Sequence, residues 1–202
     1  KEVAPDMPDI GFEFMNVEYP KSIDIAPDFG DPQTEEGLLT AYESVDPEDR
    51  IAVARAKAEP LCEHIDFALD NGLLKQTVVF GWHREPIEEM SAWLDNRGYT
   101  TRLLYGGQPE YERAATQKDF RDGKVDVVLA NIRAAGTAID LSAASHGYFL
   151  ELDWVPGSNV QAANRLVRIG KDEKVSFDVV TMPGTIDDAV QQVLLRRTRE
   201  LS

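Results

Sequence analysis

Two patterns of apolar positions alternate along the chain from residue 46 onward. Short continuous apolar runs are typical of buried strands, and apolar residues three and four apart are typical of amphipathic helices. Because the short runs lack a clean apolar–polar alternation, they predict a parallel sheet covered on both faces. The predicted fold class is therefore α/β, a doubly wound parallel sheet with helices on both faces. The expected strands are 77–80, 100–104, 125–130, 146–150 and 175–181, and the expected helices are 47–70, 87–97, 111–121, 158–169 and 186–201.

The first expected helix has clear signals at both ends. Asp46 is a typical N-cap residue, and Pro47 follows it at the first helical position, where no hydrogen-bond donor is needed. Asn71 and Gly72 predict where the helix ends. Its buried face is expected to comprise Ile51, Ala54, Ala58, Leu61, Cys62, Ile65, Ala68 and Leu69.

The N-terminal zone, residues 1–47, lacks this periodicity. Prolines interrupt it repeatedly, and only residues 11–19 alternate apolar with polar side chains, which indicates an extended segment. The zone is too short and too rich in proline to close a core of its own. We therefore interpret residues 1–47 as a linker or an edge strand, and residues 48–202 as the domain.

Composition narrows the classes of protein. Of the 202 residues, 43% are apolar and 28% charged, which excludes a chain that is disordered throughout. No apolar run approaches the ~18–20 residues that cross a bilayer, and residues 1–10 lack the features of a secretory signal. The single cysteine, Cys62, can form neither an internal disulfide nor a multi-cysteine metal site. We expect a soluble, cytoplasmic protein with no membrane partner and no metal of its own.

The net charge of −15, from 21 basic and 36 acidic residues, disfavours broad nonspecific attraction to phosphate polymers. It does not exclude a local basic stripe. Phosphate-binding loops are also missing, because neither G-x-x-x-x-G-K-[ST] nor G-x-G-x-x-G occurs after a strand. The chain is therefore not expected to hold a nucleotide by itself.

The segment 161–171, with the sequence QAANRLVRIGK, is the most informative stretch of the chain. Arg165 and Arg168 are three residues apart and are expected to share one face of a helix that Gly170 ends. Taken alone, such a pair is most often solvated on the surface or paired with nearby carboxylates. Its combination with Gln161 and with the preceding strand favours a functional role.

This segment resembles motif VI of superfamily-two helicases, in the form found in Swi/Snf-type ATPases. Further segments resemble other motifs of that family, in the family's order, over essentially residues 1–200. They are 78–83 (motif IV), 105–107 with Arg113 and Phe120, 128–144 (motif V), 152–156 (a shortened D-x-x-W-N-P), 185–188 (T-I-D-E, which opens a C-terminal brace helix) and 1–8 (the linker between the two motor lobes).

The resemblance implies the second, C-terminal RecA-like lobe of a two-lobed motor, with the first lobe expected before Lys1. In such motors ATP lies between the lobes, and the first lobe holds the phosphates and Mg²⁺. By this resemblance Arg168 is the principal arginine finger toward the γ-phosphate and Arg165 its partner, while Gln161 orients them or contacts the nucleotide. Guanidinium groups suit this task because they are always charged and bind phosphate oxygens in a bidentate manner. The isolated chain is expected to be inactive.

Motif V implies a loop that touches the DNA backbone and the nucleotide site. Gly136 and Thr137 would contact DNA, with Gly136 and Asp140 also near the nucleotide. Asp140 stands where the family usually has asparagine and adds negative charge. A plain strand-to-helix turn is the alternative for this loop.

The remaining DNA contacts implied by the resemblance are Trp82, His83 and Arg113. A purely structural role for His83 is an equal alternative. The implied partners are double-stranded DNA and the first lobe, and the implied place is the nucleoid or the nucleus, depending on the organism. A strand-separating helicase of the same superfamily and a catalytically silent α/β interaction domain are the alternative functions.

Overall fold

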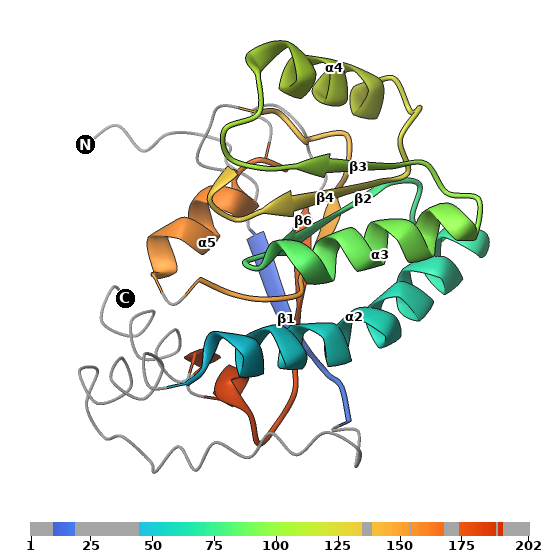
Figure 1. Ribbon diagram of the computed structural model, residues 1–202. Helices are drawn as coiled ribbons and strands as arrows, with labels where there is room; N and C mark the ends of the chain where they lie inside the picture. Colours follow the sequence, from blue (N-terminus) through green and yellow to red (C-terminus); the bar gives the residue numbers. More distant parts are fainter. Residues whose placement is uncertain are drawn as a thin grey trace, which may run out of the picture.

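The computed structural model describes residues 10–18, 45–134, 139–153, 155–167, 174–188 and 190–191. Predictions that concern other residues lie outside this part of the chain. Among the described residues, six strands form one sheet with the order β1-β6-β5-β2-β4-β3, and every neighbouring pair is parallel (Figure 1). The strands are β1 (Ile10–Asn16), β2 (Thr77–Gly81), β3 (Thr101–Leu104), β4 (Val127–Asn131), β5 (His146–Phe149) and β6 (Val175–Thr181).

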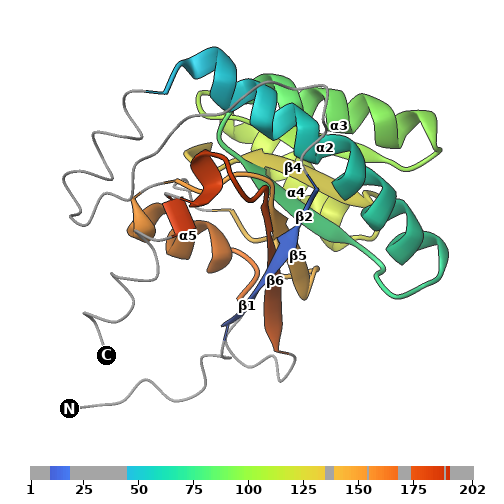
Figure 2. The ribbon, with the colours of Figure 1, turned by 90° about the horizontal axis from the view of Figure 1, so that it is seen from below.

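Four labelled helices cover the two faces of this sheet. They are α2 (Pro47–Asp70), α3 (Arg84–Asn96), α4 (Glu110–Arg121) and α5 (Pro156–Ala163). One core cluster joins α2 and α3 to Val79 and Leu129, and the other joins α4 and α5 to Val78 and Val128. Successive residues of β2 and β4 thus point to opposite faces, and both faces are buried. The predicted doubly wound α/β fold is confirmed, and Figure 2 shows the same layers from below.

Helix α2 begins and ends where its sequence predicts. Asp46 is the N-cap, and its Oδ1 accepts a hydrogen bond of 2.8 Å from the backbone N–H of Glu48. Asn71 is the C-cap, and Gly72 follows with a φ of 67°, a left-handed conformation that favours glycine. The buried face differs from the prediction at four positions, because it also contains Val53 and Lys57, whereas Ile51 and Leu69 are only partly buried.

The extended segment predicted at 11–19 is a strand over Ile10–Asn16 that pairs in parallel with β6. Val17 continues this contact, because its N–H donates to the carbonyl oxygen of Thr181 at 2.8 Å. The described part of the N-terminal zone therefore adds an edge strand to the sheet. The division of the chain at residue 47 stays a prediction.

The prediction of one helix over 158–169 is wrong at its start and end. Helix α5 begins at Pro156 and ends at Ala163. Beyond it, the N–H of Arg165 donates to the carbonyl oxygen of Ala162 at 3.0 Å, an i→i−3 bond that tightens the chain into a turn. Arg165 therefore lies past the helix end, and Arg168 lies outside the described residues. Of the helix predicted at 186–201, residues 186–188 and 190–191 are described and helical.

Glycine at position 147 in β5 is required by packing, and Gly147→Ala is expected to lower the free energy of unfolding by about 1–3 kcal/mol. A Cβ there would lie 2.5 Å from Cε1 of Phe177 and 3.2 Å from the carbonyl oxygen of Val78. The Phe177 ring is fully buried and packs against the rings of Phe80 and Phe149, so that a shift of the ring disturbs the core. Gly106→Ala is the control, because nothing lies within 4 Å of its added Cβ. Urea unfolding measures both, and equal midpoints for the two variants would contradict the expectation.

Candidate functional site

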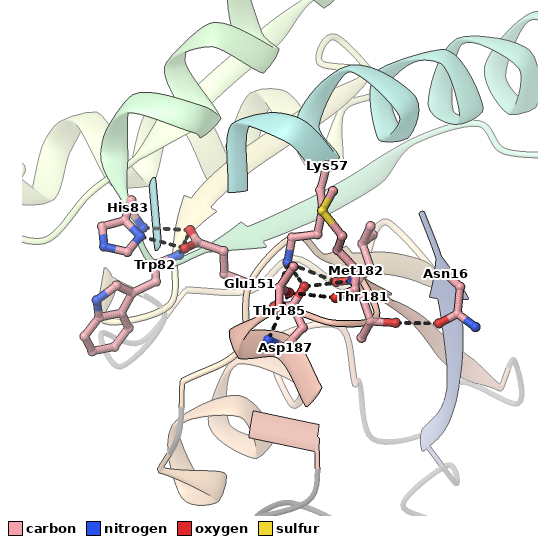
Figure 3. Close-up of polar contacts among 10 residues, drawn as sticks. Asn16, Lys57, Trp82, His83, Glu151, Thr181, Met182, Thr185 and Asp187 are labelled. Atoms are coloured by element: carbon pink, nitrogen blue, oxygen red, sulfur yellow. Dashed lines mark hydrogen bonds and ion pairs between the residues drawn. The ribbon is translucent and has the colours of Figure 1, made fainter. Parts of the chain in front are cut away.

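The carboxyl ends of β2, β5 and β6 surround a small cavity of about 30 Å³. Ligands of open parallel sheets bind at this edge, where the order of the strands reverses. The cavity is lined by residues at or beyond the ends of these strands and by residues of α2. They include Lys57, Trp82, His83, Glu151, Thr181 and Asp187, which Figure 3 shows together.

Glu151 binds the segment that follows β2. Its Oε2 accepts the backbone N–H groups of Trp82 at 2.9 Å and His83 at 2.8 Å, and its Oε1 lies 2.6 Å from Nδ1 of His83. The Glu151 side chain is 11% exposed. Burial raises the pKa of this carboxyl. The hydrogen bonds and the charge of His83 lower the pKa by more than burial raises it, so the pKa of Glu151 lies below its ordinary value. Glu151 is therefore an ionised, buried carboxylate that holds the 82–83 segment in place.

A buried ion pair lies on the other side of Glu151. The Nζ of Lys57 is 2.9 Å from Oδ2 and 3.0 Å from Oδ1 of Asp187, and it also donates to the carbonyl oxygen of Val180 at 3.2 Å. The Lys57 and Asp187 side chains are 1% and 13% exposed. Burial raises the pKa of the Asp187 carboxyl, and the positive charge of Lys57 offsets this only in part.

The segment 185–188, which resembles the T-I-D-E that opens a brace helix, is held by its own hydrogen bonds as well. The hydroxyl of Thr185 donates to the carbonyl oxygen of Met182 at 2.6 Å, and the N–H of Met182 donates to Oδ2 of Asp187 at 2.9 Å. Asp187 thus joins the end of β6 to Lys57 of α2. One signal of this contact is present in the sequence, since Lys57 falls among alanines and leucines on the apolar face of α2.

Trp82 and His83, both predicted as DNA contacts, lie side by side at the end of β2. The guanidinium of Arg133 lies over the Trp82 ring, with its Cζ 4.3 Å from the ring centroid. Asn131, at the end of β4, donates from Nδ2 to the carbonyl oxygen of Trp82 and accepts the N–H of Arg133 at 3.0 Å. Asn131 thus connects the ends of β2 and β4. The exposed Arg133 is part of this arrangement, although the sequence analysis did not predict it.

Arg113, the third DNA contact predicted on a described residue, does not lie with this pair. It comes from α4, on the opposite face of the sheet, and lines a separate small cavity with Phe80, Leu104 and Ile139. Its Nε is buried and has no hydrogen-bond partner among the described residues. The structure therefore does not bring Arg113 together with Trp82 and His83.

The described residues of motifs V and VI meet through the backbone. The N–H of Leu141 donates to the carbonyl oxygen of Arg165 at 2.9 Å. Asp140 stabilises the adjacent turn, because its Oδ1 accepts the N–H of Ser142 at 2.9 Å. Gln161 is exposed on α5. Gly136, Thr137 and Arg168 lie outside the described residues, so their predicted roles stay predictions.

Two buried side chains set the start of α5. The Oδ1 of Asn159 accepts the N–H of Asp153 at 2.8 Å, and its Nδ2 donates to the carbonyl oxygen of Asp153. The Oδ1 of Asp153 in turn accepts the N–H of Val155 at 3.0 Å. These bonds fix the direction in which α5, and with it Gln161, leaves the sheet edge.

The sequence of residues 56–170 matches the family described as helicase conserved C-terminal domain. The chain belongs to this family. The match covers more than half of the chain, and the described part of the helicase lobe has the RecA-like sheet that the family resemblance implies.

The relatives of this helicase lobe include Swi/Snf-type proteins. It is 29% identical over 198 residues to the DNA annealing helicase and endonuclease ZRANB3 of Mus musculus, a match that covers 96% of this chain and 18% of the relative. It is 32% identical over 148 residues to the Bos taurus protein of the same name, covering 72% of this chain and 14% of the relative. The DNA repair protein RAD5A of Arabidopsis thaliana is 25% identical over 151 residues, covering 74% and 14%. The helicase lobe thus spans less than a fifth of each of these relatives.

A solved structure has the same fold. The crystal structure of the C-terminal part of the Fun30 ATPase domain matches with a TM-score of 0.63 and 18% sequence identity, over 69% of this chain and 45% of that one. This likeness concerns the fold alone.

Two further properties concern the described residues of the helicase lobe. None of its helices in this part of the chain is long and apolar enough to cross a membrane. No three His, Cys, Asp or Glu side chains of this part are grouped so that they could hold a metal ion. We therefore assign no magnesium ligand to a described residue.

Proposed function

We propose that this helicase lobe is the second motor lobe of an ATP-dependent translocase on double-stranded DNA, of the Swi/Snf type. The observation that carries the proposal is the hydrogen bond between Leu141 and Arg165. It joins the segment that resembles motif V, which touches DNA in this family, to the segment that resembles motif VI, which reaches the nucleotide. A motor needs such a connection, because ATP hydrolysis must change the contact with DNA.

On the nucleotide side, Arg168 and Arg165 would act on ATP that a first lobe holds together with Mg²⁺. The charge of a transferring phosphoryl group is spread over its oxygens. A guanidinium that arrives only when two lobes close therefore stabilises the transition state more than the bound substrate. Gln161, exposed on α5, would contact the nucleotide or orient the arginines.

On the DNA side, the 82–83 segment and Arg133 would contact the backbone, together with Gly136 and Thr137. Arg133 is exposed beside Trp82, and no carboxylate of the described residues pairs with it. With a net charge of −15, the lobe as a whole repels phosphate, so contacts have to be few and local. We expect DNA binding of the isolated chain to be feeble, and that of the whole motor to depend steeply on salt.

A strand-separating helicase is the alternative within the superfamily. The ATP-dependent RNA helicase CshA of Listeria monocytogenes is 33% identical, but the match covers only 47% of this chain. The match to mouse ZRANB3 covers 96%. The extent of the two matches favours the Swi/Snf-type reading.

The proposal is tested with the complete protein that carries this lobe. We expect ATP hydrolysis that double-stranded DNA stimulates, and displacement of the third strand from a DNA triplex, which reports movement along a duplex without unwinding it. The 202-residue chain alone is expected to hydrolyse no ATP. Unwinding of a forked duplex without triplex displacement would favour the strand-separating helicase. No ATP hydrolysis by the complete protein, with or without DNA, would favour the catalytically silent interaction domain.

A further inference from the structure

Glu151 differs from an ordinary surface acid, because its carboxylate is buried and makes three hydrogen bonds to the consecutive residues Trp82 and His83. Both of its oxygens are used. An ionised carboxylate only accepts hydrogen bonds, so the short contact between Oε1 and the His83 ring requires that Nδ1 carries a proton. Nε2 is then the only ring nitrogen of His83 left to bind anything else.

The 82–83 segment also lacks support from its own side chains. His83 is the N-cap of α3, yet its side chain makes no capping hydrogen bond. The N–H groups of Trp82 and His83 instead donate to Glu151, which comes from the end of β5 and is 68 residues away from His83. Glu151 therefore orients the two N–H groups and the imidazole of this segment, while Asn131 of β4 holds the carbonyl oxygen of Trp82.

The surroundings of His83 suit an anion. Arg133 is exposed, and its guanidinium lies over the ring of Trp82, the residue before His83. The guanidinium of Arg84, the residue after His83, instead pairs with Glu88 and lies over the Tyr105 ring. The positive end of α3 begins at the same place. The nearby negative charge of Glu151 is buried and faces the opposite ring nitrogen, at 2.6 Å. In the imidazolium form of His83 both ring nitrogens carry a proton, so that Nδ1 donates to Glu151 while the N–H at Nε2 can donate to a phosphate oxygen.

We propose that Glu151 is a positioning residue, which fixes the 82–83 segment so that Nε2 of His83 faces and binds a phosphate group. This inference rests on the proposed function, in which the phosphate belongs to the DNA backbone. The same chemistry would suit a phosphate of ATP, and the experiment separates the two sources.

The test uses the ¹⁵N-labelled chain and the ring resonances of its 3 histidines, with each probe added to saturation because the isolated chain is expected to bind DNA only feebly. In the native protein we expect His83 to carry a proton on Nδ1, and a short DNA duplex to shift its Nε2 resonance. Glu151→Gln is expected to change the Nδ1 resonance and to weaken the duplex-induced effect about tenfold, as loss of one hydrogen bond to a charged group would. A parallel titration with Mg·ATP identifies the nucleotide as the source if ATP, and not the duplex, moves Nε2.

Glu89→Gln is the matched control. It makes the same chemical change in an exposed ion pair, in which the Arg55 side chain is 50% and the Glu89 side chain 51% exposed. This variant should leave the Nδ1 and Nε2 resonances of His83 unchanged. His83→Asn serves if Glu151→Gln does not fold, since its Nδ2 can replace Nδ1 toward Glu151 while Nε2 is lost. This variant is expected to bind the probe about tenfold more weakly with the fold retained.

Three results would overturn the inference. One is an unchanged His83 ring in folded Glu151→Gln, and another is undiminished probe binding by folded Glu151→Gln or His83→Asn. The third is a native His83 that neither probe moves. If DNA fails to stimulate ATP hydrolysis by the complete protein while Mg·ATP moves His83, the proposed function fails and the role of Glu151 stands. If DNA stimulates hydrolysis but neither probe moves His83, the proposed function stands and the role of Glu151 fails.

Discussion

Replacing Arg168 by alanine in the complete two-lobed protein is expected to lower ATP turnover by about 10³–10⁵-fold, the effect of an arginine finger in related phosphoryl-transfer enzymes. This corresponds to roughly 4–7 kcal/mol of transition-state stabilisation. The physical reason is that no other residue type offers a permanent charge in a planar, bidentate form to the γ-phosphate. The loss should appear in kcat at saturating DNA and ATP, because the interaction forms mainly in the transition state.

The control for this experiment is Arg121→Ala, which removes an arginine from the last turn of α4, where its side chain is 59% exposed. It should leave turnover and folding unchanged. Near-normal turnover of Arg168→Ala would remove Arg168 from the proposed role. A loss accompanied by unfolding, measured by circular dichroism, would show that Arg168 acts on the fold.

Replacing Lys57 by methionine is expected to lower the free energy of unfolding by about 3–5 kcal/mol, because it leaves Asp187 buried without its partner. The side chain of Lys57 is 1% exposed, so water cannot take the place of the lost ammonium group. The loss in free energy of unfolding caused by Lys57→Met should also depend on pH. Burial already raises the pKa of Asp187 in the native protein, and loss of Lys57 raises it further.

The sign of this pH dependence follows from the protons bound in each state. In the unfolded chain Asp187 loses its proton near pH ~3.9, whereas in the folded variant it keeps the proton to higher pH. The folded state binds more protons between these two values, so the stability of Lys57→Met falls as the pH rises above about 4. Urea unfolding at pH 5 and pH 8 measures this difference.

The double variant Lys57→Met/Asp187→Asn is the control, because it removes both charges. It should be more stable than Lys57→Met alone and should show little of the added pH dependence. A single variant with the same unfolding midpoint as the native protein would show that Lys57 and Asp187 do not stabilise the fold as a buried pair.

Much of the fold was predictable from local patterns. The Asp46 N-cap and the Asn71-Gly72 end of α2 are properties of a few neighbouring residues, and both are confirmed. The parallel sheet followed from short apolar runs with no polar face. The end of α5 was not predictable in the same way. Residues 164–167 continue a helical sequence pattern, but the N–H groups of residues 165–167 donate to carbonyl oxygens three residues back, and the carbonyl oxygen of Arg165 accepts the N–H of Leu141.

The candidate site was predictable only in part. The motif resemblance led to Trp82 and His83, which the structure places at one sheet edge, and to Arg113, which it places on the opposite face. It did not lead to Glu151 or Arg133, which contact the 82–83 segment from the ends of β5 and β4. No sequence pattern around Glu151 or Arg133 predicts these contacts, because the residues that they contact follow a different strand.

The sequence by itself determined the order of strands and helices, the ends of α2 and the membership of a helicase family, because these depend on neighbouring residues and on motifs read along the chain. Only the tertiary structure decided which side chains share the edge of the sheet. Lys57 and Asp187 are 130 residues apart, and His83 and Glu151 are 68 apart. They meet because β2, β5 and β6 are neighbours whose parallel strands all end at the same edge. Burial there makes each charge depend on a distant partner.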